Sequence, residues 1–174
     1  MANRYDRVAA ASYALRYSQK YNLEWPEYNG EDCTNFVSQA LSAGGWMMIA
    51  YYGGRDTRAW YSGKRPTTWH SWTWSNVQAF AEFLGRGSRA RRCRISELQI
   101  GDVVQLKDYN IIHHTMIVTG VLPDSLRRTS PFVTYHTRDV TQKPLNTISA
   151  EEFICWKILD VYEDPEVVVA TYGD

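Results

Sequence analysis

The stretch DCTNFVSQALSAGG, residues 32–45, decides the fold, because it predicts a helix that begins at a cysteine. Asp32 is a favourable N-cap residue, and the consecutive glycines at 44 and 45 end the helix at about Ala43. The apolar side chains between these limits share one helical face; they are Cys33, Phe36, Val37, Ala40 and Leu41. The sequence therefore predicts a helix from about Cys33 to Ala43 with the thiol in its first turn.

Two more helices are predicted, one on each side of this one. Residues 4–20 are rich in alanine, and their apolar residues follow helical spacing. In the segment SNVQAFAEFLG (75–85), Ser75 is the expected N-cap and Gly85 ends an apolar stripe. Residues 21–32 and 46–74 contain glycines, prolines and aromatic residues without a clear period, so we expect loops or irregular structure there.

The second half of the sequence is typical of strands. The segments DVVQLK (102–107), HTMIVTG (114–120), PFVTYHT (131–137) and FICWKILDV (153–161) are rich in β-branched and aromatic residues. Helices come first along the chain and strands follow. This order predicts an α+β domain in which N-terminal helices pack on a C-terminal antiparallel sheet.

Length and charge narrow the class of protein. A chain of 174 residues suits one domain, 1–174, in which residues 162–174 could form a C-terminal appendage. The 19 basic residues balance the 19 acidic ones, and a zero net charge argues against a nucleic-acid binder. No apolar run approaches the roughly 20 residues that span a bilayer. The N-terminus lacks the apolar segment of a signal peptide, so we expect a cytoplasmic protein, or an envelope or secreted one if a leader has been removed.

The cysteines do not predict a cross-linked or metal-bound protein. Cys33, Cys93 and Cys155 are odd in number and widely spaced, which is not typical of a disulfide framework. The sequence has no CxxC pair of the kind found in structural zinc sites. We expect neither a metal nor an organic cofactor.

Cys33 is the candidate nucleophile. The free N–H groups and the dipole at a helix N-terminus favour thiolate over thiol, and the same N–H groups could hold the oxyanion of an acyl-transfer intermediate. The alternative is that Cys33 is a core residue, because it shares the apolar face of its helix. The neighbouring Asp32 opposes a thiolate unless its carboxylate is turned away.

His114 is the candidate base. Strand alternation puts His114, Met116 and Val118 on one face, so the ring would stand at the mouth of the strand. His113 alternates to the opposite face. A structural role for His114 is the alternative.

His136, at the end of the next strand, is the candidate that orients the base. A base ring needs an acceptor that fixes its tautomer and direction, and one ring nitrogen of a neutral His136 could supply it. Asp139, Asp102 and Asn110 compete for this role, and a site without a third residue is the remaining alternative.

Several stretches resemble, in order, the bacterial family of the Putative amidase domain, which is related to the cysteine, histidine-dependent amidohydrolases/peptidases and to NlpC-type cell-wall peptidases. The block DCTNFVSQALSAGG (32–45) is the most specific of them. The others are YDRVAAASYALRYSQKYN (5–22), WHSWTWSNVQAFAEFL (69–84), GDVVQLKDYN (101–110), HHTMIVTG (113–120) and TYHTRDV (134–140). The resemblance covers about residues 5–161 and implies a papain-like cysteine hydrolase fold.

The resemblance also implies roles for single residues. Cys33 would be the nucleophile, His114 the base and His136 the orienting residue. NlpC-type relatives place a tyrosine hydroxyl about a dozen positions before the nucleophile, and Tyr21 stands there, so it could help at the oxyanion site. Departures from the family are NGEDC in place of a more glycine-rich lead-in and the double histidine, which leaves His113 as an alternative base.

Aromatic and basic clusters add candidate binding residues. Trp46 and Trp72 belong to a tryptophan-rich stretch that also contains Trp60, Trp69 and Trp74. Their indoles could line a peptide or glycan groove, or they could pack this stretch onto the sheet. The loop RGSRARRCR (86–94) could dock an anionic polymer or be an ordinary solvated loop.

These observations favour a cysteine-dependent amidase or peptidase that hydrolyses an amide bond through a thioacyl-enzyme. By resemblance, the substrate is a peptide or a peptidoglycan fragment. One alternative is a non-catalytic cell-wall binding module on the same fold. A metal site of Cys33, His114 and His136 is another, but the spacing of these residues is not that of a known zinc motif.

Overall fold

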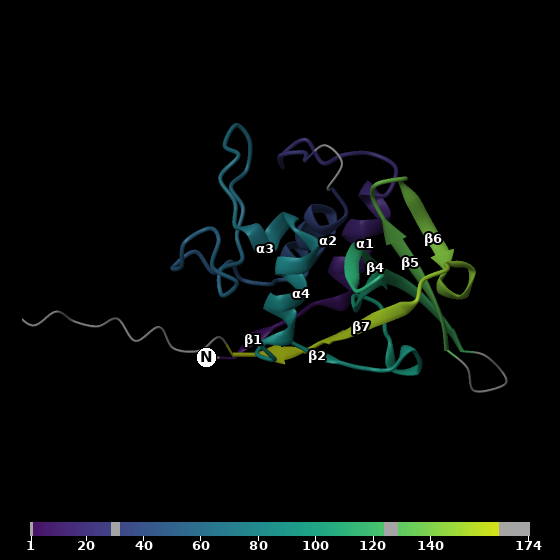
Figure 1. The fold of residues 1–174 in the computed structure, drawn as a ribbon. Coiled ribbons are helices and arrows are strands. Elements are labelled where there is room, and N and C mark those ends of the chain that lie inside the picture. Colours follow the sequence, from purple (N-terminus) through teal and green to yellow (C-terminus); the bar gives the residue numbers. More distant parts are fainter. Residues whose placement is uncertain (1, 29–31, 124–128, 164–174) are drawn as a thin grey trace, which may run out of the picture.

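The computed structural model describes residues 2–28, 32–123 and 129–163 (Figure 1). It contains four α-helices: α1 (Arg7–Tyr17), α2 (Asp32–Ala43), α3 (Trp72–Ser75) and α4 (Val77–Gly85). Two short 3-10 helices, η1 (Ile95–Glu97) and η2 (Leu145–Thr147), lie between strands. The C-terminal appendage expected at 162–174 lies outside the described residues beyond position 163.

The predicted helices are confirmed, with corrected ends. Helix α1 begins and ends inside the range 4–20, and its buried residues are the alanines Ala10, Ala11 and Ala14. The residue that caps α4 is Asn76, not Ser75: the Asn76 side chain accepts a hydrogen bond from the Ala79 N–H, while Ser75 closes the separate helix α3. After α2 the chain turns at Gly45, whose φ of +93° favours glycine.

An antiparallel sheet of six strands forms the second half of the fold. In spatial order it consists of β2 (Ala90–Arg92), β7 (Glu152–Ile158), β3 (Val103–Asp108), β4 (Ile111–Pro123), β5 (Thr129–Tyr135) and β6 (Val140–Pro144). Strands β1 (Asn3–Arg4) and β8 (Val161–Tyr162) form a separate antiparallel pair. The four predicted strands correspond to β3, β4, β5 and β7, with β8 at the end of the last one; β1, β2 and β6 were not predicted.

Two apolar clusters occupy the two faces of this sheet. Helices α1, α2 and α4 all contact the central strand β4, and Figure 1 shows the helices gathered against one side of the sheet. The core on that side joins helix residues such as Phe36 and Leu41 to sheet residues such as Ile117 and Trp156. On the other face, Met116 and other sheet residues form a second cluster with Leu98, next to η1, and Leu145 of η2. The α+β class is therefore confirmed.

The tryptophan-rich stretch is irregular, as predicted, apart from α3 and isolated bridges that join Ile49 to Trp60 and Ser62 to His70. Its tryptophans divide into two groups: Trp46, Trp60 and Trp74 are buried, whereas Trp69 and Trp72 are exposed. The buried indoles pack against one another at ring-centroid distances of 4.8 and 5.4 Å. Burial of these large rings attaches the long connection to the helical side of the core.

The basic segment 86–94 is not only a solvated loop. Strand β2 lies within it and pairs with β7, so Arg91 and Arg92 project from an edge strand. Arg89 is buried and lies over the rings of Tyr162 and Trp46, 4.5 and 5.3 Å from their centroids. A stacked guanidinium of this kind contributes to the core through cation–π contact, so Arg89 is not available to an anionic polymer.

Among the described residues, no helix has both the length and the apolar character needed to cross a membrane.

Candidate active site

Cys33 is the second residue of α2, so its sulfur lies at the N-terminal end of that helix. The first backbone N–H groups of a helix have no intrahelical partner and point toward this end. Cys33 is also buried, with 6% of its surface exposed. The expected helix is therefore confirmed, and the thiol has both the position of a nucleophile and the burial of a core residue.

A buried pair of threonines connects the Cys33 region to the His114 region. The hydroxyls of Thr34 and Thr115 lie 2.9 Å apart and join the first turn of α2 to strand β4. Gln105 on β3 supports this contact by donating to the Thr115 hydroxyl at 3.2 Å. Cys33 precedes Thr34 and His114 precedes Thr115, so this contact brings the backbones of the two candidate segments together. Because neighbouring residues of a strand point to opposite faces, it does not by itself place the His114 ring beside the Cys33 sulfur.

The surroundings of Cys33 favour its neutral form in the absence of substrate. Burial raises the pKa of the thiol, and hydrogen bonds from the Thr115 backbone and from Thr34 offset only part of that rise. The Thr34 hydroxyl lies 3.9 Å from the sulfur. A thiol with a raised pKa needs a base that removes its proton when a substrate is attacked.

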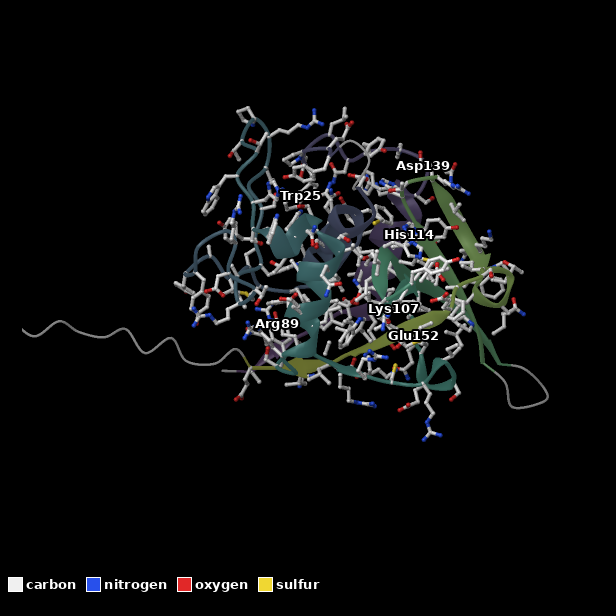
Figure 2. All side chains as sticks on the ribbon, viewed as in Figure 1. Trp25, Arg89, Lys107, His114, Asp139 and Glu152 are labelled. Atoms are coloured by element: carbon white, nitrogen blue, oxygen red, sulfur yellow. The ribbon has the colours of Figure 1, made fainter. Side chains whose placement is uncertain are left out.

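His114 is a neutral imidazole without a hydrogen-bond partner among the described residues. Its buried Nε2 atom has no partner, and its ring packs edge-on against Tyr135 at a centroid distance of 4.7 Å. Burial, together with the nearby positive groups of His113 and Arg138, lowers the pKa of His114 to about 4. Figure 2 labels the ring beside the upper end of the sheet. The described structure contains no hydrogen bond between this ring and the Cys33 sulfur.

His113 has a different environment. It lies where the register between β3 and β4 shifts, and its exposed ring is 2.7 Å from a carboxylate oxygen of Asp108. The ring is therefore bound at the β3–β4 hairpin on the surface.

His136 is buried, and both of its ring nitrogens are engaged. Nδ1 is 2.5 Å from a carboxylate oxygen of Asp32, and Nε2 is 2.8 Å from the backbone carbonyl oxygen of Tyr17. A carbonyl and a carboxylate only accept hydrogen bonds, so both ring nitrogens donate and the ring is an imidazolium. The neutral acceptor that we expected to orient His114 is therefore absent from this arrangement, because His136 makes its two hydrogen bonds to other groups.

Opposing effects set the charge of His136. Burial lowers its pKa, but the hydrogen bonds to Asp32 and to the Tyr17 carbonyl raise it by more, so the pKa lies above its ordinary value. The ring also stacks on Phe36 at a centroid distance of 3.9 Å, and Tyr21 packs edge-on against it at 4.9 Å. His136 thus belongs to the packed interior around α2.

Asp32 is the first residue of α2 and connects His136 to a wider polar network. Its second carboxylate oxygen accepts from the side-chain amide of Asn35 at 2.8 Å. The same amide nitrogen donates to the Pro26 carbonyl at 3.0 Å, while the Asn35 oxygen accepts from the Trp74 indole at 2.8 Å. The Asp32 side chain is therefore turned toward His136 and Asn35 and does not cap the helix as we expected.

The competitors of His136 have other partners or positions. Asp102 is fully buried and pairs with Arg7 and Lys157 at 2.6 and 2.9 Å, which makes it a structural anion. Asn110 lies in the β3–β4 turn with a φ of 63°. Asp139 lies in the turn after β5, and it raises the pKa of His136 through its charge. None of the three forms a hydrogen bond with His114 in the described part of the chain.

The candidate substrate-binding residues differ in how exposed they are. Tyr21 is 39% exposed and lies next to His136, which places its ring at the same end of α2 as Cys33. Trp72 is exposed and lies under the guanidinium of Arg55 at 5.4 Å. Trp46, by contrast, is 2% exposed and packs against Tyr5 and Trp60, so its indole is not presented to a substrate.

An open pocket of about 520 Å³ lies near the N-terminal end of α2. Its lining residues are Pro26, Glu27, Arg65, Pro66, Thr67 and Thr68. The Pro26 carbonyl that Asn35 binds ties one wall of this pocket to the first turns of α2. Arg65 and Glu27 form an ion pair across it at 3.0 Å, so the pocket presents both signs of charge.

Within the described ranges, no group of three or more His, Cys, Asp or Glu side chains is arranged to hold a metal ion.

Comparison with known proteins assigns the chain to a family. Residues 4–159 match the family described as Putative amidase domain. The chain belongs to this family. It is 28% identical to the uncharacterised protein YjcM of Bacillus subtilis (strain 168) over 85% of its length, and 32% identical to the uncharacterised protein YhbB of the same organism over 68%. The matched segments make up 34% and 38% of those proteins, so the chain spans about a third of the curated relatives that it matches. No solved structure matches the chain.

Sequence reasoning missed several polar residues that hold the candidate site together. Asp32 was read as a helix cap, and Asn35, Thr34 and Thr115 were not singled out at all. Asp32, Thr34 and Asn35 all lie within the DCTNF block that contains Cys33. Their burial among apolar helix residues is the signal that could have found them, because polar side chains in a core need partners.

The His114 ring is expected to titrate far below a typical histidine. Burial without a hydrogen-bond acceptor disfavours the imidazolium, so the ring should gain its proton only near pH 4. A titration of the histidine ring resonances by NMR measures this value, and the variant His114→Gln identifies the resonance. A midpoint between 6 and 7 for that resonance would mean that the ring is solvated or paired in solution.

Substitution of His136 by Gln should destabilise the fold, because it leaves the carboxylate of Asp32 buried without its cation. Removal of one partner of a buried ion pair costs about 3–5 kcal/mol. The difference in the free energy of unfolding between the parent and the variant should be largest below about pH 6.5, where the parent's His136 is charged. It should shrink as the pH rises through the raised pKa of His136, because the parent then loses that charge as well. Urea unfolding of the parent and the variant at several pH values measures the difference.

The matched control for this experiment is the double variant Asp32→Asn with His136→Gln, which removes both charges. It should recover part of the lost stability. A single His136→Gln variant as stable as the parent at pH 6 would contradict the buried ion pair.

Proposed function

We propose that this protein is a cysteine amidase or peptidase on a papain-like domain, with Cys33 as nucleophile and His114 as base. The observation that carries the proposal is the position of a thiol at the N-terminus of α2, joined through the Thr34–Thr115 contact to a strand whose His114 keeps an unpartnered buried nitrogen. Membership of the putative amidase family supports amide hydrolysis as the reaction.

The two groups start as a neutral thiol and a neutral imidazole. The raised pKa of Cys33 and the lowered pKa of His114 both oppose a standing thiolate–imidazolium pair. Proton transfer therefore accompanies attack on the substrate. Hydrogen bonds between catalytic groups often tighten only when substrate is bound, so the contact between Cys33 and His114 belongs to the substrate complex.

The reaction then proceeds in two halves. His114 takes the thiol proton while the Cys33 sulfur attacks the amide carbon, and the resulting oxyanion binds the free N–H groups of the first turn of α2. His114 gives its proton to the nitrogen of the leaving amine, and a thioester remains on Cys33. In the second half His114 takes a proton from water while the hydroxide attacks the thioester carbon. The C–S bond then breaks, His114 returns the proton to the Cys33 sulfur, and the acid product leaves.

His136 serves this site as a positioning residue in our proposal. Its imidazolium neutralises Asp32, the residue that precedes the nucleophile, and so weakens the opposition of that carboxylate to a developing thiolate. The same ion pair attaches the start of α2 to the end of β5 and to the last carbonyl of α1. Tyr21, which packs on His136, is proposed to lie beside the substrate.

The proposed substrate class is a peptide, such as a peptidoglycan stem peptide. The pocket at Glu27 and Arg65 supports this choice, because its paired charges suit a ligand that carries both carboxylate and ammonium groups. The exposed Trp72 offers an aromatic surface on the connection that follows the pocket residues.

Both Cys33→Ala and His114→Gln should abolish or strongly reduce hydrolysis. Loss of the nucleophile should remove turnover, and loss of a general base typically costs about 10²–10⁴-fold in rate. Peptidoglycan fragments are incubated with each variant, and the released amines and acids are measured by mass spectrometry. Cys93→Ser is the matched control, because it removes a thiol that lies outside the candidate site, and it should keep parental turnover.

Two outcomes would contradict this proposal. Hydrolysis that survives Cys33→Ala would assign the reaction to other residues. Binding of fragments that is unchanged by Cys33→Ala, with no product from the parent, would instead identify a non-catalytic cell-wall binding module.

In the folded protein, Cys33 should react with iodoacetamide faster than Cys155. Burial raises the pKa of Cys155 to about 12, and its side chain packs in the apolar cluster of the sheet on strand β7. Mass-spectrometric mapping of alkylated peptides over time compares the two rates. Equal rates, or slower modification of Cys33, would favour a core role for Cys33.

A further inference from the structure

Cys93 and Cys155, which are far apart in the sequence, lie directly opposite each other across two strands. The pairing of β2 with β7 matches Arg91 to Lys157 and Arg92 to Trp156, so the next register position matches Cys93 to Cys155. The Cys93 N–H donates to the Cys155 carbonyl at 3.0 Å, which extends the ladder by one residue beyond β2. The two backbones are therefore hydrogen-bonded at the cysteines themselves.

The two side chains also point to the same face of the sheet. Cys155 is a buried member of the apolar cluster on the face away from the helices, and Cys93 packs against that cluster while remaining partly exposed. Residues that face each other in an antiparallel pair project their side chains to the same side. Both thiols are free in the structure.

This arrangement matches the requirements of a disulfide. Opposed residues in a hydrogen-bonded antiparallel pair have Cα atoms about 5.5 Å apart. Disulfides bridge Cα separations of about 4.4–6.8 Å, with the commonest values near 5.5–6 Å. We propose that Cys93 and Cys155 form a cross-strand disulfide site that closes when the protein meets a disulfide oxidant.

The oxidation needs a small disulfide, such as oxidised glutathione, as co-reactant. Cys93 is the more exposed thiol, so its thiolate attacks one sulfur of the oxidant, forms a mixed disulfide and expels the first small thiolate. The Cys155 sulfur then attacks the Cys93 sulfur and expels the second. Two protein thiols are oxidised, one disulfide of the oxidant is reduced to two thiols, and the two protein protons end on those thiols.

The disulfide would affect the edge strand β2 and the thiol of Cys33. Strand β2 is the edge strand of the sheet, and a covalent link to β7 holds it there. The bridge would also leave Cys33 as the one free thiol of a chain that contains three cysteines, which protects the proposed nucleophile from exchange with the other two.

The test incubates the folded protein with oxidised glutathione, blocks the remaining thiols after denaturation, and maps disulfide-linked peptides by mass spectrometry without reduction. The expected product is a linked pair of the Cys93 and Cys155 peptides, with Cys33 alkylated. The melting temperature should rise by about 5 °C or more, and dithiothreitol should reverse the rise.

Two variants make the result specific. Cys33→Ser should form the same bridge, whereas Cys93→Ser should lose both the linked peptides and the thermal shift. The proposal is overturned if the oxidised protein, with its fold intact by circular dichroism, carries Cys93 and Cys155 as unlinked thiols or as separate glutathione adducts. A link that joins Cys33 to either of them would overturn it as well.

Discussion

The buried ion pair between Asp32 and His136 is the interaction on which the rest of the candidate site depends. It joins the first residue of α2 to the end of β5, and through the Tyr17 carbonyl it also reaches α1. A buried charge is tolerated only when its partner and its hydrogen bonds are complete, and here each group has two partners. The position of Cys33 follows from this constraint, because the thiol belongs to the residue that comes next in the chain.

A second, neutral contact sets the distance between the helix and the sheet. The Thr34 and Thr115 hydroxyls meet inside the core, and Gln105 and the Trp156 indole extend the hydrogen bonds across β3 to β7. Because side chains alternate along a strand, neighbouring residues of β4 point to opposite faces of the sheet. Thr115 points to the helices, whereas His114 points to the opposite face, which carries Met116 and Tyr135. Tyr135 is the last residue of β5. Cys33 belongs to α2, which contacts β4 on the helical face, so the structure shows the candidate nucleophile and the candidate base on different faces of this strand.

The sequence was sufficient for the parts of this fold that repeat with a regular period. Helix α2 and strands β3, β4, β5 and β7 are long or strongly patterned, and they were predicted within a few residues. Strand β2 was missed because ARR has no apolar alternation, and its strand conformation comes from pairing with β7. The site was harder to predict. Helical spacing identified Cys33, but no local pattern indicates that His136 binds Asp32, because that contact joins two distant segments through tertiary packing.

His136 and His114 show that contacts, and not residue type, determine the charge of a histidine ring. His136 has two acceptors that outweigh the cost of burial, so it is charged and both of its nitrogens carry protons. His114 has no acceptor within the described ranges, and burial lowers its pKa, which favours the neutral ring. A general base must have a free lone pair at working pH, and of these two rings His114 is the one with an unpartnered nitrogen. The environment thus separates the two rings into a cation that compensates Asp32 and a neutral ring, and this difference is the reason that we propose His114, and not His136, as the base.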